Sequence, residues 1–160
     1  MALLIVLGSF VPNTTTPVEA ELTVVQEGNT PIATQKTVRY PLEGYVVTQG
    51  FSLFHPAVDL AAPFGSPIYP VKDGVVADIS YSRFAYGNAV IIDHGNQVTS
   101  LYAHLAKIEV EKGQKVTTLT EIGKSGSTGH STGPHLHLEI RNHGVPVNPF
   151  AVLPSPVSPI

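Results

Sequence analysis

The chain of 160 residues contains no cysteine and few charged residues, and each absence excludes a class of chemistry. Without cysteine there is no disulfide, no thiolate nucleophile and no zinc ribbon, so a metal site would have to use histidine and carboxylate ligands. Charged residues make up 13% of the chain, where about 25% is typical of globular domains. The net charge of −3 gives no reason to expect a nucleic-acid partner, because binding nucleic acid requires a basic face.

Glycine, proline and histidine are abundant instead. The 14 glycines and 14 prolines favour short strands and turns over helices. Hydrophobic residues reach 42%, which is enough for one packed core and argues against wholesale disorder. Seven histidines stand against nine lysines and arginines, so the side chains that commonly titrate near neutral pH are unusually numerous.

Changes in composition divide the chain into four segments. Residues 1–20 are apolar and uncharged up to Glu19. The apolar run within them, residues 2–7 followed by Phe10 and Val11, is too short to span a bilayer, which needs about 20 apolar residues. Residues 1–20 are interpreted as a truncated secretion signal or membrane anchor, with an extra hydrophobic strand as the alternative. Residues 21–39 are interpreted as a linker, residues 40–153 as the compact domain and residues 154–160 as a proline-rich tail. A signal or anchor predicts an extracytoplasmic protein, whereas nothing in the sequence indicates the oligomeric state.

Five segments of the compact domain have the composition of β-strands, rich in Val, Ile and Tyr and bounded by turn residues. They are Tyr45–Gln49, Gly74–Ile79, Asn88–Asp93, Gln97–Ala103 and His135–Arg141. The segment 93–96 between two of them is typical of a hairpin connection, and no long stretch has the apolar spacing of a helix. The sequence therefore predicts an all-β domain of short antiparallel strands.

Two histidines alternate with two leucines at the start of the last of these segments. In a strand, side chains two residues apart share a face, so His135 and His137 would point to one side and Leu136 and Leu138 to the core. Such a pair can serve one metal site, either as two ligands or as one ligand and one acid–base group. A solvated strand face is the alternative interpretation.

His55 and Asp59 are four positions apart. This spacing would place both on one face of a helix, but Pro56, Pro63 and Gly65 disfavour a helix here. A loop leading into a short strand would still bring both side chains to one cation. A turn aspartate beside an unrelated surface histidine is the alternative.

His104 follows an alternating strand, and the alternation predicts it on the same face as Ser100 and Tyr102. An ordinary half-buried histidine is the alternative. Taken together, His55, Asp59 and one histidine of the strand pair supply three ligands and leave a fourth position for water, as in catalytic zinc sites. His104 and the other histidine of the pair would then be free for acid–base work.

Other motifs of nucleophilic and phosphate chemistry are absent from the sequence. It contains no H-E-x-x-H, no G-x-S-x-G and no G-x-G-x-x-G motif. Gly123–Ser125 is similar to the end of a P-loop but lacks the first glycine, because Thr118 occupies that position. Gly126–Gly129 is interpreted as a flexible loop leading to the histidine strand.

From Gly50 to Phe150 the sequence resembles the lysostaphin/LytM-type zinc endopeptidases, which cut peptidoglycan peptides. The resemblance rests on short motifs in matching order: HPAVDL from His55, GSPIY from Gly65, DGVV from Asp73, YGNAV from Tyr86, YAHL from Tyr102 and STGPHLHLEIR from Ser131. It implies a small antiparallel β-sheet or barrel-like domain with an open groove, the duplicated hybrid motif. It also implies one Zn²⁺ ion on His55, Asp59 and His137, with His104 and His135 as catalytic residues.

Several positions remain open beside this resemblance. Ala57 stands where many members of the family have glycine, and it would strain the loop if the position required a positive φ. Glu139 shares a strand face with His137 and is either a partner of that ligand or part of a surface salt bridge. Asn88 either lines the groove or satisfies a tight turn. The remaining histidines are interpreted as structural or surface residues: His94, His130 and His143.

The complete set of five residues favours a zinc metalloendopeptidase that hydrolyses peptidoglycan cross-links or bridges, using zinc-activated water and two histidines. One alternative is a non-catalytic wall-binding or amidase-activating module of the same fold. A second is a lipoyl- or biotinyl-type carrier, although the sequence has no Met-Lys-Met-like site. The predicted partners are peptidoglycan peptides, and the sequence does not select the scissile bond.

Overall fold

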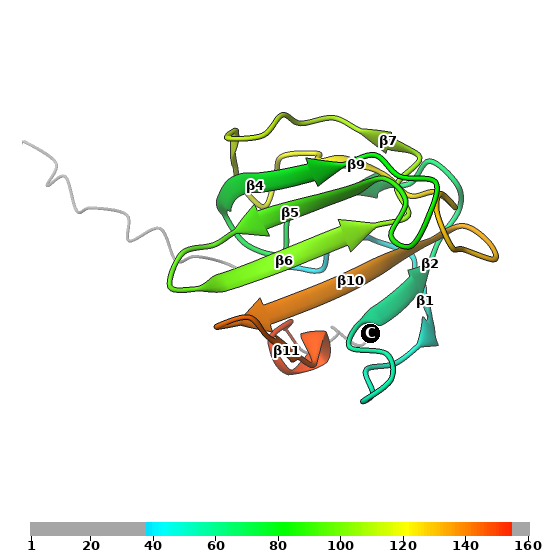
Figure 1. Ribbon diagram of the computed structural model, residues 1–160, viewed down its shortest axis with the longest axis horizontal. Helices are drawn as coiled ribbons and strands as arrows, with labels where there is room; N and C mark the ends of the chain where they lie inside the picture. Colours follow the sequence, from blue (N-terminus) through cyan, green and yellow to red (C-terminus); the bar gives the residue numbers. More distant parts are fainter. Residues whose placement is uncertain (1–37, 155–160) are drawn as a thin grey trace, which may run out of the picture. The chain divides into compact units, whose positions relative to one another are not determined.

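Residues 38–154, the part of the chain that the computed structural model describes, form two antiparallel β-sheets (Figure 1). The larger sheet has the strand order β1-β2-β10-β6-β5-β4-β8, with β11 also paired to β10, and the smaller sheet has the order β3-β9-β7. The only helix in this range is the 3₁₀ helix η1, and it is far too short to cross a bilayer. The elements are β1 (Val46–Gln49), β2 (Val58–Ala61), β3 (Pro67–Ile68), β4 (Gly74–Ser80), β5 (Ala89–Asp93), β6 (Val98–Ala103), β7 (Lys107–Ile108), β8 (Lys115–Val116), β9 (Gly123–Lys124), β10 (His135–Asn142), β11 (Val145–Val147) and η1 (Pro149–Ala151).

These elements confirm the predicted all-β antiparallel fold. The five predicted strands correspond to β1, β4, β5, β6 and β10. The predicted hairpin connection is confirmed as well, because β5 ends at Asp93 and β6 begins at Val98. The predicted N-terminal apolar segment, nearly all of the linker and nearly all of the proline-rich tail lie outside residues 38–154.

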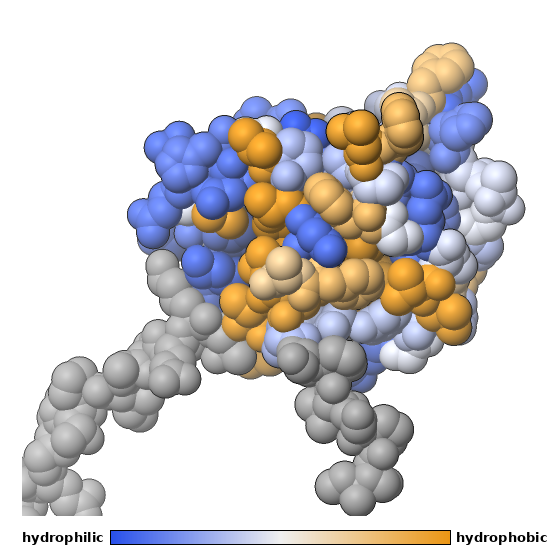
Figure 2. Space-filling view, turned by 90° about the horizontal axis from the view of Figure 1, so that it is seen from below, coloured by the Kyte–Doolittle hydropathy of each residue, from blue (hydrophilic) through white to orange (hydrophobic). Residues whose placement is uncertain are grey.

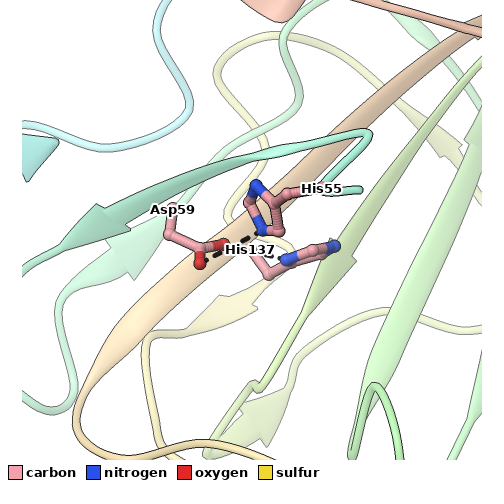
Figure 3. A group of neighbouring side chains, drawn as sticks. All are labelled: His55, Asp59 and His137. Atoms are coloured by element: carbon pink, nitrogen blue, oxygen red, sulfur yellow. Dashed lines mark hydrogen bonds and ion pairs between the residues drawn. The ribbon is translucent and has the colours of Figure 1, made fainter. Parts of the chain in front are cut away.

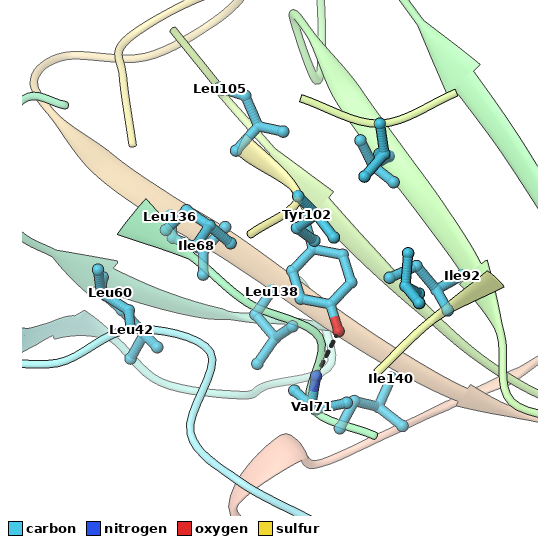
Figure 4. Close-up of a cluster of buried hydrophobic side chains, with 14 of the residues drawn as sticks. Leu42, Leu60, Ile68, Val71, Ile92, Tyr102, Leu105, Leu136, Leu138 and Ile140 are labelled. Carbon is cyan, nitrogen blue, oxygen red and sulfur yellow. Dashed lines mark hydrogen bonds between the residues drawn. The ribbon is translucent and has the colours of Figure 1, made fainter. Parts of the chain in front are cut away.

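One face of β10 packs into the hydrophobic core. Leu136, Leu138 and Ile140 are almost completely buried, as the alternation predicts. Tyr102 on the neighbouring β6 is fully buried too, and its hydroxyl oxygen accepts a hydrogen bond of 2.8 Å from Val71 N (Figure 4). Burial of each of these aliphatic side chains contributes about 2 kcal/mol. The core therefore fixes β10 and holds its alternate residues on the opposite face of the sheet.

The margin of the larger sheet is apolar and exposed. β1 is an edge strand, and Val46 and Val47 expose 67% and 45% of their surface. Val145 of β11 is exposed as well, and Figure 2 shows hydrophobic patches alternating with hydrophilic ones on this side of the molecule. Gln49 ends β1 and lines a groove on the sheet, so this edge strand borders that groove.

Candidate metal centre

His55, Asp59 and His137 come together from two neighbouring strands and from the loop before one of them (Figure 3). Asp59 on β2 pairs directly with His137 on β10, and His55 lies in the loop that leads into β2. Asp59 faces away from the core because its neighbours Val58 and Leu60 are fully buried in it. The candidate ligand atoms of the three side chains all lie within 4.8 Å of one another.

The distances single out one nitrogen of each imidazole ring. His137 Nδ1 lies 2.8 Å from Asp59 Oδ1, and His55 Nε2 lies 3.3 Å from Asp59 Oδ2. His55 Nδ1 donates a hydrogen bond of 3.1 Å to Gly50 O, so Nε2 is the unprotonated nitrogen of its neutral ring. Two imidazoles and one carboxylate at this spacing match the donor set of a zinc site with an open fourth position. The residues present therefore fit a zinc ion.

The charges of these side chains shift one another's pKa values. Burial alone would raise the pKa of Asp59, but its hydrogen bond to His137 and the neighbouring histidines lower it below its ordinary value. Burial alone would lower the pKa of His137, yet hydrogen bonds to Asp59 and Glu139 raise it to about 9. Because metal ions bind neutral imidazole, a metal ion at this group would compete with a proton for His137.

His104 and His135 form a second pair beside these three residues, with ring centroids 4.7 Å apart. His104 Nδ1 donates to Thr128 O at 2.8 Å, and His135 Nδ1 donates to Gly133 O at 2.9 Å. In each neutral ring Nε2 is therefore the proton acceptor. Burial, reinforced by the neighbouring histidines, holds the pKa of His104 below its ordinary value. His104 is thus neutral at pH 7, which is the state that a general base requires.

The alternation of β6 predicts the wrong face for His104. Ser100 and Tyr102 are buried in the core, whereas His104 lines the groove. β6 ends at Ala103, and His104 follows with a φ of +62°, a left-handed conformation that breaks the alternation. Such a conformation costs about 1–3 kcal/mol in a residue other than glycine and is typical of functional sites. Ala57 is not left-handed, so the absence of glycine at that position causes no strain of this kind.

The Gly126–Gly129 loop, predicted to be flexible, is tightly packed. Thr128 Oγ1 accepts a hydrogen bond of 3.0 Å from Asn88 N, and the Asn88 side chain donates one of 3.1 Å to Leu105 O and is not among the residues that line the groove. Gly129 lies so close to the backbone of Gly87 that an added Cβ atom would lie 2.3 Å from Gly87 N. These contacts fix the Thr128 carbonyl that orients one histidine of the second pair.

The five predicted site residues line one groove of about 380 Å³. A second hollow of about 360 Å³ shares Gln49, Asp59, Thr132 and His135 with it, so the groove continues past His135. His130 lines the groove as well, although the sequence interpretation treats it as structural or surface. It lies in a turn, where no periodicity indicates the direction of a side chain, so the sequence has no signal for this placement.

Residues 53–149 match the model of one protein family, described as peptidase family M23. The peptidoglycan DD-endopeptidase ShyA of Vibrio cholerae is 50% identical over 94 residues, which are 59% of this chain and 22% of that protein. The DD-carboxypeptidase/endopeptidase Mpg of Neisseria meningitidis is 48% identical over 103 residues, which are 64% of this chain and 24% of that protein. The chain thus matches less than a quarter of the length of these curated relatives.

Solved structures share the fold. A zinc-containing peptidase from Vibrio cholerae has a TM-score of 0.66 at 35% sequence identity, over 71% of this chain and 39% of that one. Lysostaphin from Staphylococcus simulans has a TM-score of 0.66 at 27% identity, over 80% of this chain and 60% of that one. The family match spans more than half of the sequence and includes the His–Asp–His group, the second histidine pair and the strands that carry them. The chain therefore belongs to peptidase family M23.

Proposed function

We propose that the protein is a zinc metalloendopeptidase that hydrolyses peptide bonds in peptidoglycan cross-links or bridges. The observation that carries this proposal is the His–Asp–His group with a second pair of histidines beside it in one groove. His55, Asp59 and His137 would hold one zinc ion, and His104 and His135 would be the catalytic residues. The named activities of the two relatives support the substrate class. The non-catalytic alternative is not favoured, because all five residues are present and adjacent.

Zinc suits this donor set, and when bound it would supply Lewis-acid chemistry, polarising a water molecule and the peptide carbonyl. Asp59 is the single carboxylate among the three proposed ligands. Two neutral imidazoles add no charge, so the loaded centre would keep a net positive charge. That charge stabilises negative charge developing on the carbonyl oxygen of a substrate.

The second histidine pair moves the protons in this proposal. His104 and His135 each donate Nδ1–H to a backbone carbonyl and so present an unprotonated Nε2. One ring accepts the proton of the attacking water at Nε2. A ring protonated there becomes cationic and donates a hydrogen bond to an oxygen on which negative charge develops. Both rings have this hydrogen-bond arrangement, so both are candidates for the general base.

The substrate would be an extended peptide lying along the groove. The two hollows meet at His135, so a peptide can continue on both sides of the reacting centre. Peptidoglycan lies outside the cytoplasm, so the proposal includes an extracytoplasmic location, with residues 1–20 as a signal or membrane anchor. Residues 40–153 would be the peptidase domain, joined by the linker 21–39 and followed by the tail 154–160.

The test is digestion of purified peptidoglycan, with mass spectrometry of the released muropeptides. We expect cleavage that a chelator abolishes and added Zn²⁺ restores. His137→Ala should lose both zinc and activity, whereas His104→Ala should keep one equivalent of zinc and lose about 10²–10⁴-fold in rate. His143→Ala, an exposed histidine, is the matched control and should behave as wild type. A wild-type protein that binds one zinc ion without releasing any peptide product would refute the proposal in favour of a non-catalytic module.

A further inference from the structure

Glu139 is a buried carboxylate next to the candidate metal centre. It exposes only 1% of its surface, although it lies on the groove-facing side of β10 with His137. Burying a carboxylate is unfavourable unless it is hydrogen-bonded and paired, so its partners decide what it does here. Every buried side-chain nitrogen and oxygen within residues 38–154 has a hydrogen-bond partner, and Glu139 is no exception.

The two oxygens of Glu139 have different partners. Oε2 accepts hydrogen bonds of 2.9 Å from Arg141 Nε and 2.7 Å from Arg141 Nη2. Oε1 accepts the hydroxyl hydrogen of Tyr86 and faces His137 Nε2 at 3.4 Å. The bidentate arginine fixes the plane of the carboxylate, which directs the other oxygen at the histidine ring. The salt bridge with Arg141 and the contact with His137 are thus parts of one arrangement.

The contact with Glu139 distinguishes His137 from the other three histidines of the proposed site. His55, His104 and His135 each donate one ring proton to a backbone carbonyl. His137 turns its Nε2 to a carboxylate instead, and its Nδ1 to Asp59. A carboxylate that accepts the second ring proton of a metal ligand fixes the tautomer and strengthens the other nitrogen as a donor to the metal.

We propose that Glu139 is a positioning residue that holds the Nε2–H tautomer of His137, with Tyr86 and Arg141 holding Glu139 in turn. The inference rests on the proposed function, since it takes His137 as a metal ligand. Tyr86 lies in the loop between β4 and β5 and also lines the groove, with its ring centroid 5.5 Å from that of His137. Tyr86 in the groove wall therefore influences the metal affinity of the site through Glu139.

The test measures zinc affinity by competition with a chromophoric chelator, and the absorption spectrum of the Co²⁺-substituted protein. Glu139→Gln keeps the size of the side chain and removes its charge, and we expect zinc binding about 10–100-fold weaker. The Co²⁺ spectrum should shift, because the electron donation of His137 changes. Glu121→Gln is the matched control: it removes a surface carboxylate that pairs with Lys124, and it should leave both readouts unchanged.

Tyr86→Phe keeps the carboxylate and removes only one of its donors, so it decides the question if Glu139→Gln does not fold. We expect Tyr86→Phe to weaken zinc binding by a smaller factor than Glu139→Gln. Zinc affinities and Co²⁺ spectra equal to wild type in both folded variants, or in Tyr86→Phe where it alone folds, would overturn the inference. Failure of the proposed function is distinguishable, because wild type itself would then bind no zinc or release no peptide.

Discussion

Gly129 is the point at which the loop that orients His104 crosses the loop before β5. Its φ is +71°, and an added Cβ atom would lie 2.3 Å from Gly87 N and 2.5 Å from Ala85 O. Both are backbone atoms, which cannot rotate away as the end of a long side chain can. Thr128 precedes Gly129 and supplies the carbonyl that accepts the His104 Nδ1–H bond. Gly129→Ala should therefore disturb the fold and the proposed catalytic histidine together.

The expected loss of folding stability in Gly129→Ala has two separate contributions. A left-handed backbone costs about 1–2 kcal/mol for a residue that carries a Cβ atom. Overpacking against fixed neighbours costs about 1–3 kcal/mol more. Gly144 is the matched control, because its φ is +76° and nothing lies within 4 Å of the Cβ position. Gly144→Ala should therefore lose only the first contribution, and the difference between the two variants isolates the crowding at Gly129.

The assay is urea unfolding of both variants at neutral pH, followed by peptidoglycan digestion under conditions in which both are folded. We expect Gly129→Ala to have the lower free energy of unfolding by about 1–3 kcal/mol, and to have the lower rate of digestion. Gly144→Ala should keep the wild-type rate, because it is not among the residues that line the groove. Equal unfolding free energies in the two variants would refute the steric argument. An unchanged rate in folded Gly129→Ala would refute the link to His104.

Three further predictions concern residues outside the groove. Burial holds the pKa of His94 below its ordinary value. Below about pH 6.5 the unfolded chain therefore binds a proton that the folded chain does not. Stability falls as the pH falls, until the lower pKa of the folded state is reached. His94→Gln should remove this contribution, seen as a shallower pH dependence than wild type in urea titrations from pH 7 to 5. Tyr102→Phe leaves Val71 N–H without its acceptor and should cost about 1–3 kcal/mol in thermal unfolding. Lys112→Ala breaks a solvent-exposed ion pair with Asp78 and should leave the thermal midpoint unchanged within error.

In the described part of the chain, the sequence predicts the strands of five or more residues and misses the strands of two residues. β4, β5, β6 and β10 have five to eight residues each, which is enough for a recognisable composition and alternation. β3, β7, β8 and β9 have two residues each, and they exist because distant segments pair with them. β2 has four residues between two prolines, and its place beside β10 was not predictable from local pattern.

The candidate site was predictable where the backbone is regular and not where it is irregular. Alternation on β10 correctly places His135 and His137 on one face. The direct pairing of His137 with Asp59 joins segments 78 positions apart. The residues alone group Asp59 with one histidine of the strand pair, and the resemblance to a family selects His137. His104 was assigned to the wrong face because a left-handed residue interrupts the period of two.

The difference between His135 and His137 lies in the second nitrogen of each ring. His135 gives its Nδ1 proton to Gly133 O, in the turn before the strand, and presents Nε2 to the groove. His137 turns Nε2 to Glu139 and presents Nδ1 to Asp59. The alternation that places the two histidines on one face also places Glu139 there, two positions from His137 and four from His135. A carboxylate on this face can adjoin only the nearer ring, so Glu139 can act on His137 and not on His135.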